Sequence, residues 1–216
     1  MARLSLEQQC KNIPLDLHEI SLQYEGDPEP ALLRHFESLG YIGSYVEGAT
    51  ILTALKALML DALTEYNIFQ DRKDACCRYL EAQLTILKDR TDLLVSSIAK
   101  TNRKSFIRNA NEILSQSFIK GLYPSLTVDC LLAIFDAIDT SVFQKVAMKI
   151  SEDPYGYRAG WPDLTIVKDK EVQFIEVKTT DKLHNSQLKT IPVMMSVLPY
   201  KFSIYRLTRA GSGLAL

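Results

Sequence analysis

Apolar side chains recur every three or four residues through much of the first two thirds of the chain. The clearest example lies between residues 48 and 66, where one helix face would carry Ile51, Leu52, Leu55, Leu58, Met59, Ala62 and Leu63. A shorter helix is expected over residues 31–36, after the Gly- and Pro-containing segment 26–30. Further helical patterns cover about 71–101, 104–119 and 126–150. This part of the chain is therefore predicted to be mainly helical.

The pattern changes after a loop rich in glycine and tyrosine at residues 154–160. Two β-branched and apolar segments, 164–167 and 172–177, flank the charged residues 168–171, which is typical of a β-hairpin. A helix over about 185–198 and a strand over 201–207 are expected to follow. The predicted order is a helix, a helical insertion, two strands, a helix and a strand.

Composition and charge narrow the class of protein. Hydrophobic residues make up 47% and charged residues 24%, which is typical of a folded globular domain. The net charge of -1 argues against a strongly basic coat, so contacts with nucleic acid would depend on local patches. Residues 88–120 are the best basic candidate, and a solvated helix face explains their charges equally well. The four cysteines and three histidines lack zinc-site spacing. No apolar run follows Met1, so we expect no signal peptide, no membrane partner and an intracellular location, cytoplasmic if bacterial and nuclear if eukaryotic.

The expected hairpin brings two acidic residues together. A two-residue turn at Asp169 and Lys170 would pair Asp163 with Glu176. Like charges directly opposite each other destabilise a sheet, and a bound divalent cation is the simplest reason for this arrangement. Lys178 would lie on the same face as Glu176, because side chains alternate along a strand. It could orient or deprotonate a water molecule, or neutralise charge on a phosphate. An aspartate that follows a proline at the start of a strand, or a Glu-Val-Lys segment within a strand, usually has only a structural role when it occurs alone. The combination of the two favours a metal site.

At these residues the sequence resembles the VRR-NUC branch of the PD-(D/E)XK nucleases. The matching residues are Gly160-Trp161-Pro162-Asp163-Leu164, Glu176-Val177-Lys178, Asp181-Lys182-Leu183 and Gln187. The resemblance implies an α/β restriction-endonuclease-like core with a mixed sheet and a large α-helical insertion. It also implies an N-terminal extension over residues 1–27 and a nuclease domain over 28–216. Within that domain, the insertion is expected at about 70–150, the catalytic strands at 162–178, and the helix and last strand at 185–208.

A second block is similar to the catalytic domain of Fanconi-associated nuclease. It comprises His35-Phe36, Leu39-Gly40-Tyr41, Glu47-Gly48 and residues 55–61. In that family a glutamate at the start of a helix completes the metal ligands, and Glu47 stands at the matching position. A glutamate near a helix N-terminus is also favoured by the helix dipole alone.

The resemblance implies a complete set of site residues. Catalysis would use Asp163, Glu176, Lys178 and Glu47. One or two Mg²⁺ or Mn²⁺ ions would be held by Glu47, Asp163, Glu176 and the Val177 carbonyl. Contacts with DNA or phosphate are expected from Arg158, Gln187, Lys182, Arg103 and Lys104. The chain departs from the family at Thr179-Thr180, where Gly-Pro is usual, and at Tyr155 and Ser186, where basic residues hold a 5′ phosphate.

The expected function is a metal-dependent DNA nuclease that is specific for flap or branched DNA and acts in repair. Its products would be 5′-phosphate and 3′-hydroxyl ends. Two alternatives stay open at this point, a non-catalytic DNA-binding module with a nuclease-like fold and a dimeric junction resolvase. Longer family members carry upstream DNA-binding and helical-repeat domains, so this chain is expected to be a nearly bare catalytic domain, with DNA targeting by a separate chain as a further option.

Overall fold

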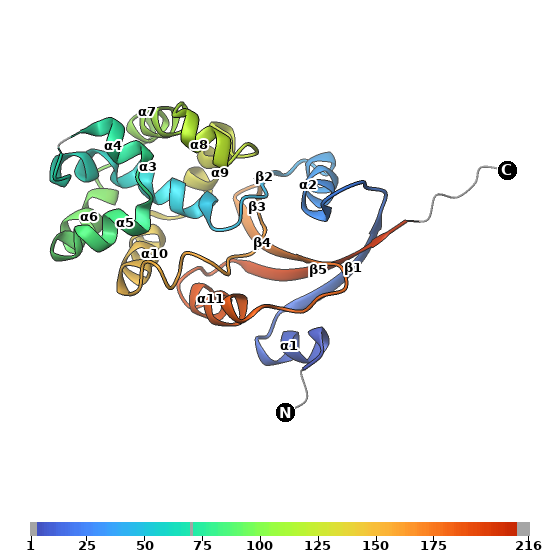
Figure 1. The fold of residues 1–216 in the computed structure, drawn as a ribbon. Helices are drawn as coiled ribbons and strands as arrows, with labels where there is room; N and C mark the ends of the chain where they lie inside the picture. Colours follow the sequence, from blue (N-terminus) through green and yellow to red (C-terminus); the bar gives the residue numbers. More distant parts are fainter. Residues whose placement is uncertain (1–3, 70, 211–216) are drawn as a thin grey trace.

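The molecule has a helical half and a half built on a β-sheet, as Figure 1 shows. The computed structural model describes residues 4–69 and 71–210. Residues 211–216, which the sequence places in the nuclease domain, lie outside the described residues. In the described part of the chain, no helix combines the length and the apolar character that crossing a membrane requires.

The sheet has five strands in the order β1-β5-β4-β3-β2. Their bounds are β1 (Asp16–Leu22), β2 (Ile42–Ser44), β3 (Leu164–Lys168), β4 (Glu171–Lys178) and β5 (Lys201–Arg209). Strand β3 is antiparallel to both of its neighbours, β2 and β4, whereas β5 lies parallel to both β4 and β1. The sheet is therefore mixed, as the sequence predicts.

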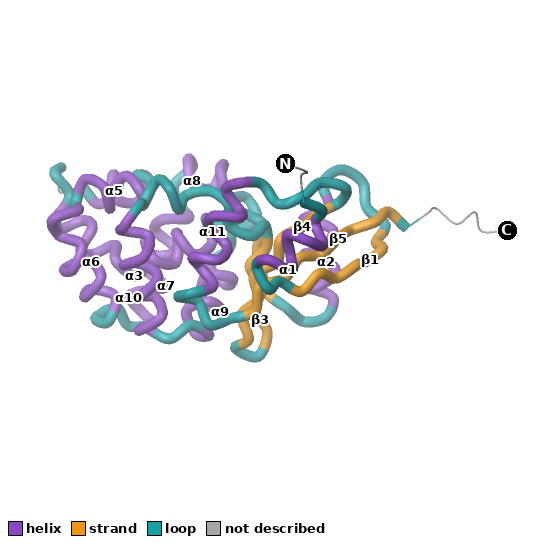
Figure 2. Tube along the Cα trace, turned by 90° about the horizontal axis from the view of Figure 1, so that it is seen from below, coloured by secondary structure: helices purple, strands orange, loops and turns teal. Residues whose placement is uncertain are grey.

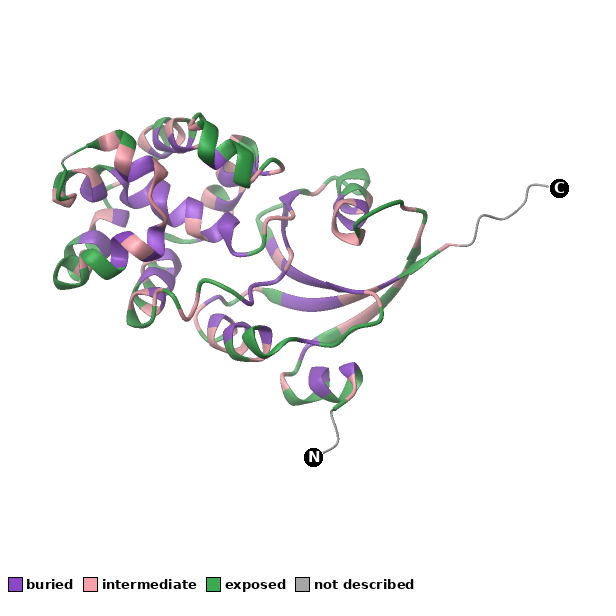
Figure 3. Cartoon of the chain, in the orientation of Figure 1, coloured by how far each residue is buried: buried purple, intermediate pink, exposed green. Residues whose placement is uncertain are grey.

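The helical half consists of the long helix α3 and the shorter helices around it (Figures 1 and 2). Their bounds are α3 (Ala49–Tyr66), α4 (Arg72–Cys77), α5 (Leu80–Ile86), the 3₁₀ helix η1 (Lys88–Arg90), α6 (Thr91–Ile98), α7 (Arg103–Leu114), α8 (Ser117–Leu122), α9 (Val128–Ala137) and α10 (Thr140–Glu152). Nearly every α3 side chain from residue 49 to residue 63 is buried, because neighbouring helices surround it. Figure 3 shows this concentration of buried residues inside the helical half.

Three helices cover the two faces of the sheet (Figure 1). Helix α2 (Pro28–Ser38) packs on one face through Leu32, Leu33 and Phe36, against apolar residues of β3, β4 and β5. Helices α1 (Leu6–Asn12) and α11 (Asn185–Met195) lie at the opposite face, where their core is continuous with that of the helical half. Two apolar cores on opposite faces require every strand between them to alternate its side chains.

The expected elements of residues 28–210 are present, with two differences. The helical pattern over 71–101 is divided among α4, α5, η1 and α6, because turns interrupt it. Strands β1 and β2 are not predicted from the sequence. Strand β1 lies within the predicted N-terminal extension, yet it pairs with β5 as an edge strand of the same sheet. Strand β2 has only three residues, too few for a recognisable alternation.

Candidate active site

The hairpin between β3 and β4 has the register expected from the sequence. Asp169 and Lys170 have φ angles of 51° and 67°, and two consecutive left-handed residues form the two-residue turn that suits a twisted hairpin. The ladder pairs Lys168 with Glu171 and continues to Leu164 and Ile175. One step further along this register, Asp163 lies opposite Glu176. The predicted juxtaposition of the two carboxylates is therefore confirmed.

All three predicted hairpin residues lie on one face of the sheet. Ile175 and Val177 belong to the core under α2, whereas Phe174 belongs to the core on the opposite side. Because side chains alternate, Glu176 and Lys178 share the face of Phe174, which is the face toward α11 and the helical half. Asp163 lies two residues before Thr165 and four before Val167, whose side chain also packs on this face.

Glu176 is almost completely buried, with 1% of its surface exposed. Its Oε1 accepts hydrogen bonds from Lys178 Nζ at 2.8 Å and from Gln187 Nε2 at 2.5 Å. Its Oε2 is also buried, but it has no hydrogen-bond partner among the described residues. Burial of a carboxylate oxygen without a hydrogen-bond donor costs free energy. The orphaned Oε2 atom therefore indicates a ligand that is not part of the chain.

Asp163 is held between the hairpin and the start of α3. Its Oδ2 accepts a hydrogen bond of 2.7 Å from the Val177 backbone N–H, and its carbonyl accepts one of 3.1 Å from the Glu47 backbone N–H. The first bond fixes the carboxylate beside Glu176. The second bond fixes the backbone of Glu47 beside the hairpin.

Burial and mutual repulsion disfavour ionisation of the two carboxylates. Burial raises the pKa of Glu176 most, and the charge of Asp163 raises it further, against the effects of Lys178 and Gln187. Burial also raises the pKa of Asp163, and the negative charge of Glu29 raises it further. The hydrogen bond from the Val177 backbone N–H has the opposite effect and lowers this pKa. A divalent cation between the two groups would remove this penalty, because it compensates both charges.

Lys178 remains a cation in this environment. Burial favours a lower pKa, but its contacts with Glu176 and with Asp181 Oδ2, at 3.1 Å, outweigh burial and raise the pKa of the ammonium. A protonated lysine can orient water or neutralise phosphate charge, whereas it cannot accept a proton. Orientation of water and neutralisation of phosphate charge agree with this protonation state, and the catalytic role of Lys178 stays a prediction.

The donor set suits a hard divalent cation. Asp163 and Glu176 offer carboxylate oxygens, which are the ligands that Mg²⁺ and Mn²⁺ prefer, and Glu176 Oε2 is free to bind. Within residues 4–69 and 71–210, no three side chains of histidine, cysteine, aspartate or glutamate converge at metal-binding distance. Asp163 and Glu176 thus supply two carboxylates for a cation. A third ligand would be a side chain that moves toward them, a backbone carbonyl group or a water molecule.

Glu47, the predicted third carboxylate, has an unusual backbone. Its φ angle is 49°, in the left-handed region that side chains other than glycine rarely adopt. The next residue, Gly48, touches the buried Trp161, and a Cβ atom at Gly48 would lie 2.4 Å from the indole ring. This close contact fixes the start of α3 against the segment before Asp163. The Glu47 side chain is exposed, and its role as a metal ligand stays a prediction.

Gln187 reaches Glu176 because α11 starts close to the loop before β3. Gly160 has φ 84°, and a Cβ atom at this position would lie 2.3 Å from the Ser186 backbone. The Gln187 side chain accepts the His184 backbone N–H at 2.9 Å, which directs its amide nitrogen toward Glu176. Gln187 thus contacts a predicted metal ligand, and its expected contact with DNA or phosphate stays a prediction.

The other predicted contacts with DNA lie outside this cluster. Arg158 forms an ion pair with the buried Glu81, at 3.0 Å, and lies over the Tyr79 ring. Lys182 is exposed in the loop after β4. Arg103 pairs with Asp136, and both Arg103 and Lys104 lie in α7, in the helical half (Figure 1). The structure does not bring these cations together, and their roles stay predictions.

Three residues that sequence reasoning did not assign to the site contact it or influence it. Asp181 binds Lys178, Glu29 raises the pKa of Asp163, and Gln9 pairs with the backbone of Leu183 in the loop after β4. Asp181 was part of the recognised motif but had no role. Glu29 and Gln9 carry no motif, so only the fold reveals them.

Comparisons with known proteins agree with the resemblance found in the sequence. No protein-family model matches the chain. A curated relative, a Fanconi-associated nuclease 1 homolog from Schizosaccharomyces pombe (strain 972 / ATCC 24843), is 26% identical over 180 residues, which cover 78% of this chain and 25% of the relative. The chain thus spans about a quarter of the length of that relative. The predicted resemblance to Fanconi-associated nuclease is confirmed.

Solved structures support the fold. Two crystal structures of paFAN1, bound to 5′ flap DNA with a gap and carrying flaps of two nucleotides and one nucleotide, match 97% of this chain and 39% of theirs. Their TM-scores are 0.61 and 0.62, with sequence identities of 20% and 21%. The predicted α/β PD-(D/E)XK fold with a mixed sheet and a helical insertion is confirmed.

Proposed function

We propose that this chain is a metal-dependent nuclease that hydrolyses phosphodiester bonds in flap or branched DNA. The observation that carries the proposal is the buried Glu176 carboxylate, with one oxygen held by Lys178 and Gln187, the other without a partner, and Asp163 alongside. The names of the similar proteins support it, since one is a nuclease homolog and two are complexes with flap DNA. A role in DNA repair is part of the proposal.

The cation is proposed to be Mg²⁺ or Mn²⁺, with one or two ions held by Asp163, Glu176, the Val177 carbonyl and Glu47. When bound, such an ion supplies Lewis-acid stabilisation of phosphate charge and makes water a stronger nucleophile. Asp163 is oriented for this role by the Val177 N–H, and Glu176 by Lys178 and Gln187. Rigid placement of the ligands by the hairpin reduces the reorganisation needed when substrate binds.

Lys178 is proposed to stabilise charge that develops on the phosphate. Its ammonium already bridges Glu176 and Asp181, so it can give a hydrogen bond to a phosphate oxygen while staying anchored to the site. In the proposed reaction, water adds to phosphorus and the bond to the 3′ oxygen breaks. That oxygen takes up a proton, so the products are a 3′-hydroxyl and a 5′-phosphate.

The test is cleavage of end-labelled flap, four-way junction and single-stranded DNA by purified protein in Mg²⁺ or Mn²⁺. The informative variants are Asp163→Asn and Glu176→Gln, which keep side-chain size. The matched control is Glu171→Gln, because Glu171 is an exposed carboxylate on the same strand. We expect loss of cleavage of at least a hundredfold in the first two and activity close to wild type in the control.

Other outcomes would separate the alternatives. Cleavage that survives both site substitutions would assign the activity to a contaminant. Thermal stabilisation by Mn²⁺ and binding of DNA without any cleavage would indicate a non-catalytic module, because a ligand that binds only the native state raises its stability. Preferential cutting of the four-way junction by a dimer, measured by light scattering of the complex, would indicate a resolvase.

A further inference from the structure

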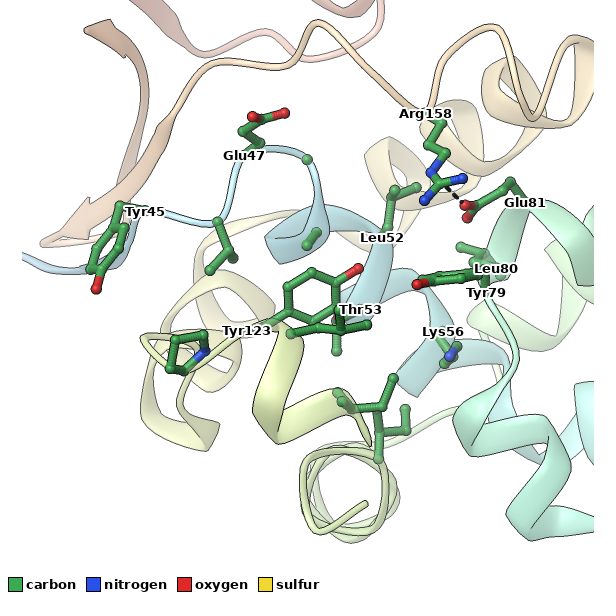
Figure 4. Close-up of a pocket in the computed structure, with 17 residues that line it drawn as sticks. Tyr45, Glu47, Leu52, Thr53, Lys56, Tyr79, Leu80, Glu81, Tyr123 and Arg158 are labelled. Carbon is green, nitrogen blue, oxygen red and sulfur yellow. Dashed lines mark ion pairs between the residues drawn. The ribbon is translucent and has the colours of Figure 1, made fainter. Parts of the chain in front are cut away.

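A pocket of about 370 Å³ opens beside Glu47 (Figure 4). It is formed by the start of α3, by α5, and by the segment between α8 and α9. Its volume lies in the range of sites for small organic molecules. Apolar side chains, among them Leu52, Leu80 and Ile113, cover part of the wall.

Two tyrosines give the pocket an aromatic character. Tyr79 and Tyr123 come from different segments, and Figure 4 shows their hydroxyl groups directed toward each other across the pocket. Burial raises the pKa of Tyr123, and the proximity of Tyr79 adds to the effect, so the Tyr123 hydroxyl stays a protonated donor near neutral pH. The Arg158 guanidinium lies over the Tyr79 ring, so the stacking surface is assigned to the Tyr123 ring. An aromatic ring combined with hydroxyl donors suits a flat heteroaromatic ligand.

The polar groups of the pocket are buried rather than solvated. Glu81 is 3% exposed, although its ion-pair partner Arg158 is half exposed at the mouth. Lys56 is 5% exposed and donates a 2.9 Å hydrogen bond to the Cys76 carbonyl. An ammonium has three donors, and this bond uses one of them. A buried carboxylate and a buried ammonium in one cavity can together recognise a group that has both donors and acceptors.

We infer that this pocket takes the base of an unpaired nucleotide of the DNA substrate, held by Tyr79 and Tyr123 and by the buried charges of Glu81 and Lys56. The inference rests on the proposed nuclease function. Bases have an aromatic face for stacking, exocyclic amino groups that donate to a carboxylate, and ring nitrogens or carbonyl groups that accept from an ammonium. Flap and branched DNA contain such unpaired nucleotides, so no paired base has to be extracted.

The charges of the pocket argue against a free phosphate group as its ligand. Glu81 and Glu47 balance Lys56 and Arg158 among the lining residues, so the cavity has no net positive charge. A phosphate dianion would also meet the buried carboxylate of Glu81. The ion pair with Glu81 uses Nε–H of Arg158, and a guanidinium has five N–H donors. Arg158 can therefore contact the backbone phosphate of the same nucleotide at the mouth while the base occupies the cavity.

The pocket adjoins the proposed cleavage site through Glu47 and Gly48. Both residues line the pocket, and the Glu47 backbone N–H bonds to the Asp163 carbonyl. A base in the pocket would thus hold its nucleotide at a fixed distance along the strand from the hairpin carboxylates. This arrangement would determine which phosphodiester bond reaches the site.

The experiment measures binding of flap DNA by fluorescence anisotropy in an Asp163→Asn background with Mg²⁺, so that the DNA stays intact. One flap or junction nucleotide at a time is replaced by an abasic tetrahydrofuran residue. We expect about tenfold weaker binding when one particular base is removed, the lower part of the range for a stacked base. In Tyr79→Ala and Tyr123→Ala variants the same abasic replacement should have almost no effect, because the contact is already lost. Phe69→Ala, which removes an exposed aromatic side chain outside the pocket, should behave like the background protein.

Three results would overturn the inference. The first is an equal affinity for flap DNA whichever nucleotide is made abasic. The second is a loss of affinity on abasic replacement that is as large in both tyrosine variants as in the background protein. The third is tight binding of a free deoxynucleoside monophosphate in the pocket while no abasic replacement changes the affinity for DNA. If Tyr123→Ala fails to fold, Tyr123→Phe and Glu81→Gln provide the same comparison, with weaker discrimination between bases expected. Cleavage is measured separately with the wild-type protein in Mn²⁺, so loss of the base effect with intact cleavage would refute the pocket and leave the proposed nuclease function standing.

Discussion

The side-chain amide of Gln9 pairs with both backbone polar groups of Leu183. Its Nε2 donates to the Leu183 carbonyl at 3.2 Å, and its Oε1 accepts the Leu183 N–H at 2.9 Å, so a residue of α1 imitates a neighbouring strand. The loop that it holds follows β4 and includes Asp181, which binds Lys178. The amino-terminal segment thus supports the loop that carries Asp181 from a distance of 174 residues along the chain.

Replacing Gln9 with alanine should therefore affect both stability and activity. Two buried backbone groups would lose their partners, which costs roughly 1–3 kcal/mol of unfolding free energy. The turnover number should fall, because the loop that Gln9 holds carries Asp181, which binds Lys178. Urea denaturation and steady-state cleavage measure the two effects. Lys11→Ala, an exposed change on the same helix, is the control, and equal behaviour of the two variants would refute the coupling.

The left-handed backbone of Glu47 predicts a difference between two substitutions. Glu47→Ala and Glu47→Gly both remove the carboxylate, so both should lower cleavage strongly if Glu47 is a metal ligand. At φ 49°, glycine avoids a steric cost that alanine retains, and the glycine variant should be more stable than the alanine variant by about 1 kcal/mol. Thermal unfolding and cleavage assays in Mn²⁺ measure the pair. A glycine variant with wild-type activity would show that the Glu47 carboxylate is not a metal ligand.

A Glu29 variant tests whether Glu47 is the third carboxylate that binds the metal. Its charge, like that of Glu47, raises the pKa of Asp163, so both lie within electrostatic range of the site. Glu47→Gln should weaken Mn²⁺ binding at least tenfold in calorimetric titration, whereas Glu29→Gln should change it only slightly. The reverse result would transfer the third ligand from Glu47, just before α3, to Glu29 in α2.

Stability without metal should fall as pH rises. The native state raises the pKa of Glu176 from the ordinary value of 4.5 to about 8, so between these values the folded protein binds more protons than the unfolded chain. Unfolding free energy therefore decreases from pH 5 to pH 8 in EDTA and levels off above that range. Differential scanning calorimetry of wild type and Glu176→Gln isolates the effect, since the variant has no proton to lose at this position.

Addition of Mn²⁺ should reverse that dependence. Binding requires ionised carboxylates, so the stabilisation by Mn²⁺ should be larger at pH 8 than at pH 5. A wild-type protein whose pH profile in EDTA coincides with that of Glu176→Gln would contradict the electrostatic description of the site.

Two glycines provide a test of the packing that brings α11 to the site. Gly160→Ala places a Cβ atom against the Ser186 backbone at φ 84°, so it should destabilise the fold by more than about 1 kcal/mol and weaken the contact of Gln187 with Glu176. Gly121→Ala is the control, because no atom lies within 4 Å of the added Cβ and the residue is in helix α8. That control should stabilise the protein by roughly 0.5–1 kcal/mol. Destabilisation of similar size in both variants would refute the proposed close contact.

The part of the site that the sequence predicts is the part built from local structure. The turn at Asp169 and Lys170 determines the register, and alternation along β4 then places Glu176 and Lys178 on one face. Both rules act over a few residues, so one sequence was sufficient to apply them. The family motif added Gln187, whose position close to Glu176 depends on the contact between Gly160 and Ser186.

The remaining features depend on contacts between distant segments. Strand β1 carries mainly half-exposed side chains, and its partner β5 is far away in sequence, so its own pattern was too weak to predict it. The pocket beside Glu47 combines Lys56, Tyr79, Glu81 and Tyr123, which belong to separate helices and connections of the insertion. Arg158 was expected to be a free cation for phosphate, and its pairing with Glu81 followed only from the fold.

The central claim is that Asp163 and Glu176 share a divalent cation. The most direct test is anomalous X-ray scattering from crystals of the wild-type protein grown with Mn²⁺. The account predicts a manganese peak within about 2.6 Å of oxygens from both carboxylates, including Glu176 Oε2, and no such peak in Glu176→Gln crystals. A wild-type map without a peak between these two residues, at a manganese concentration that supports cleavage, would contradict it.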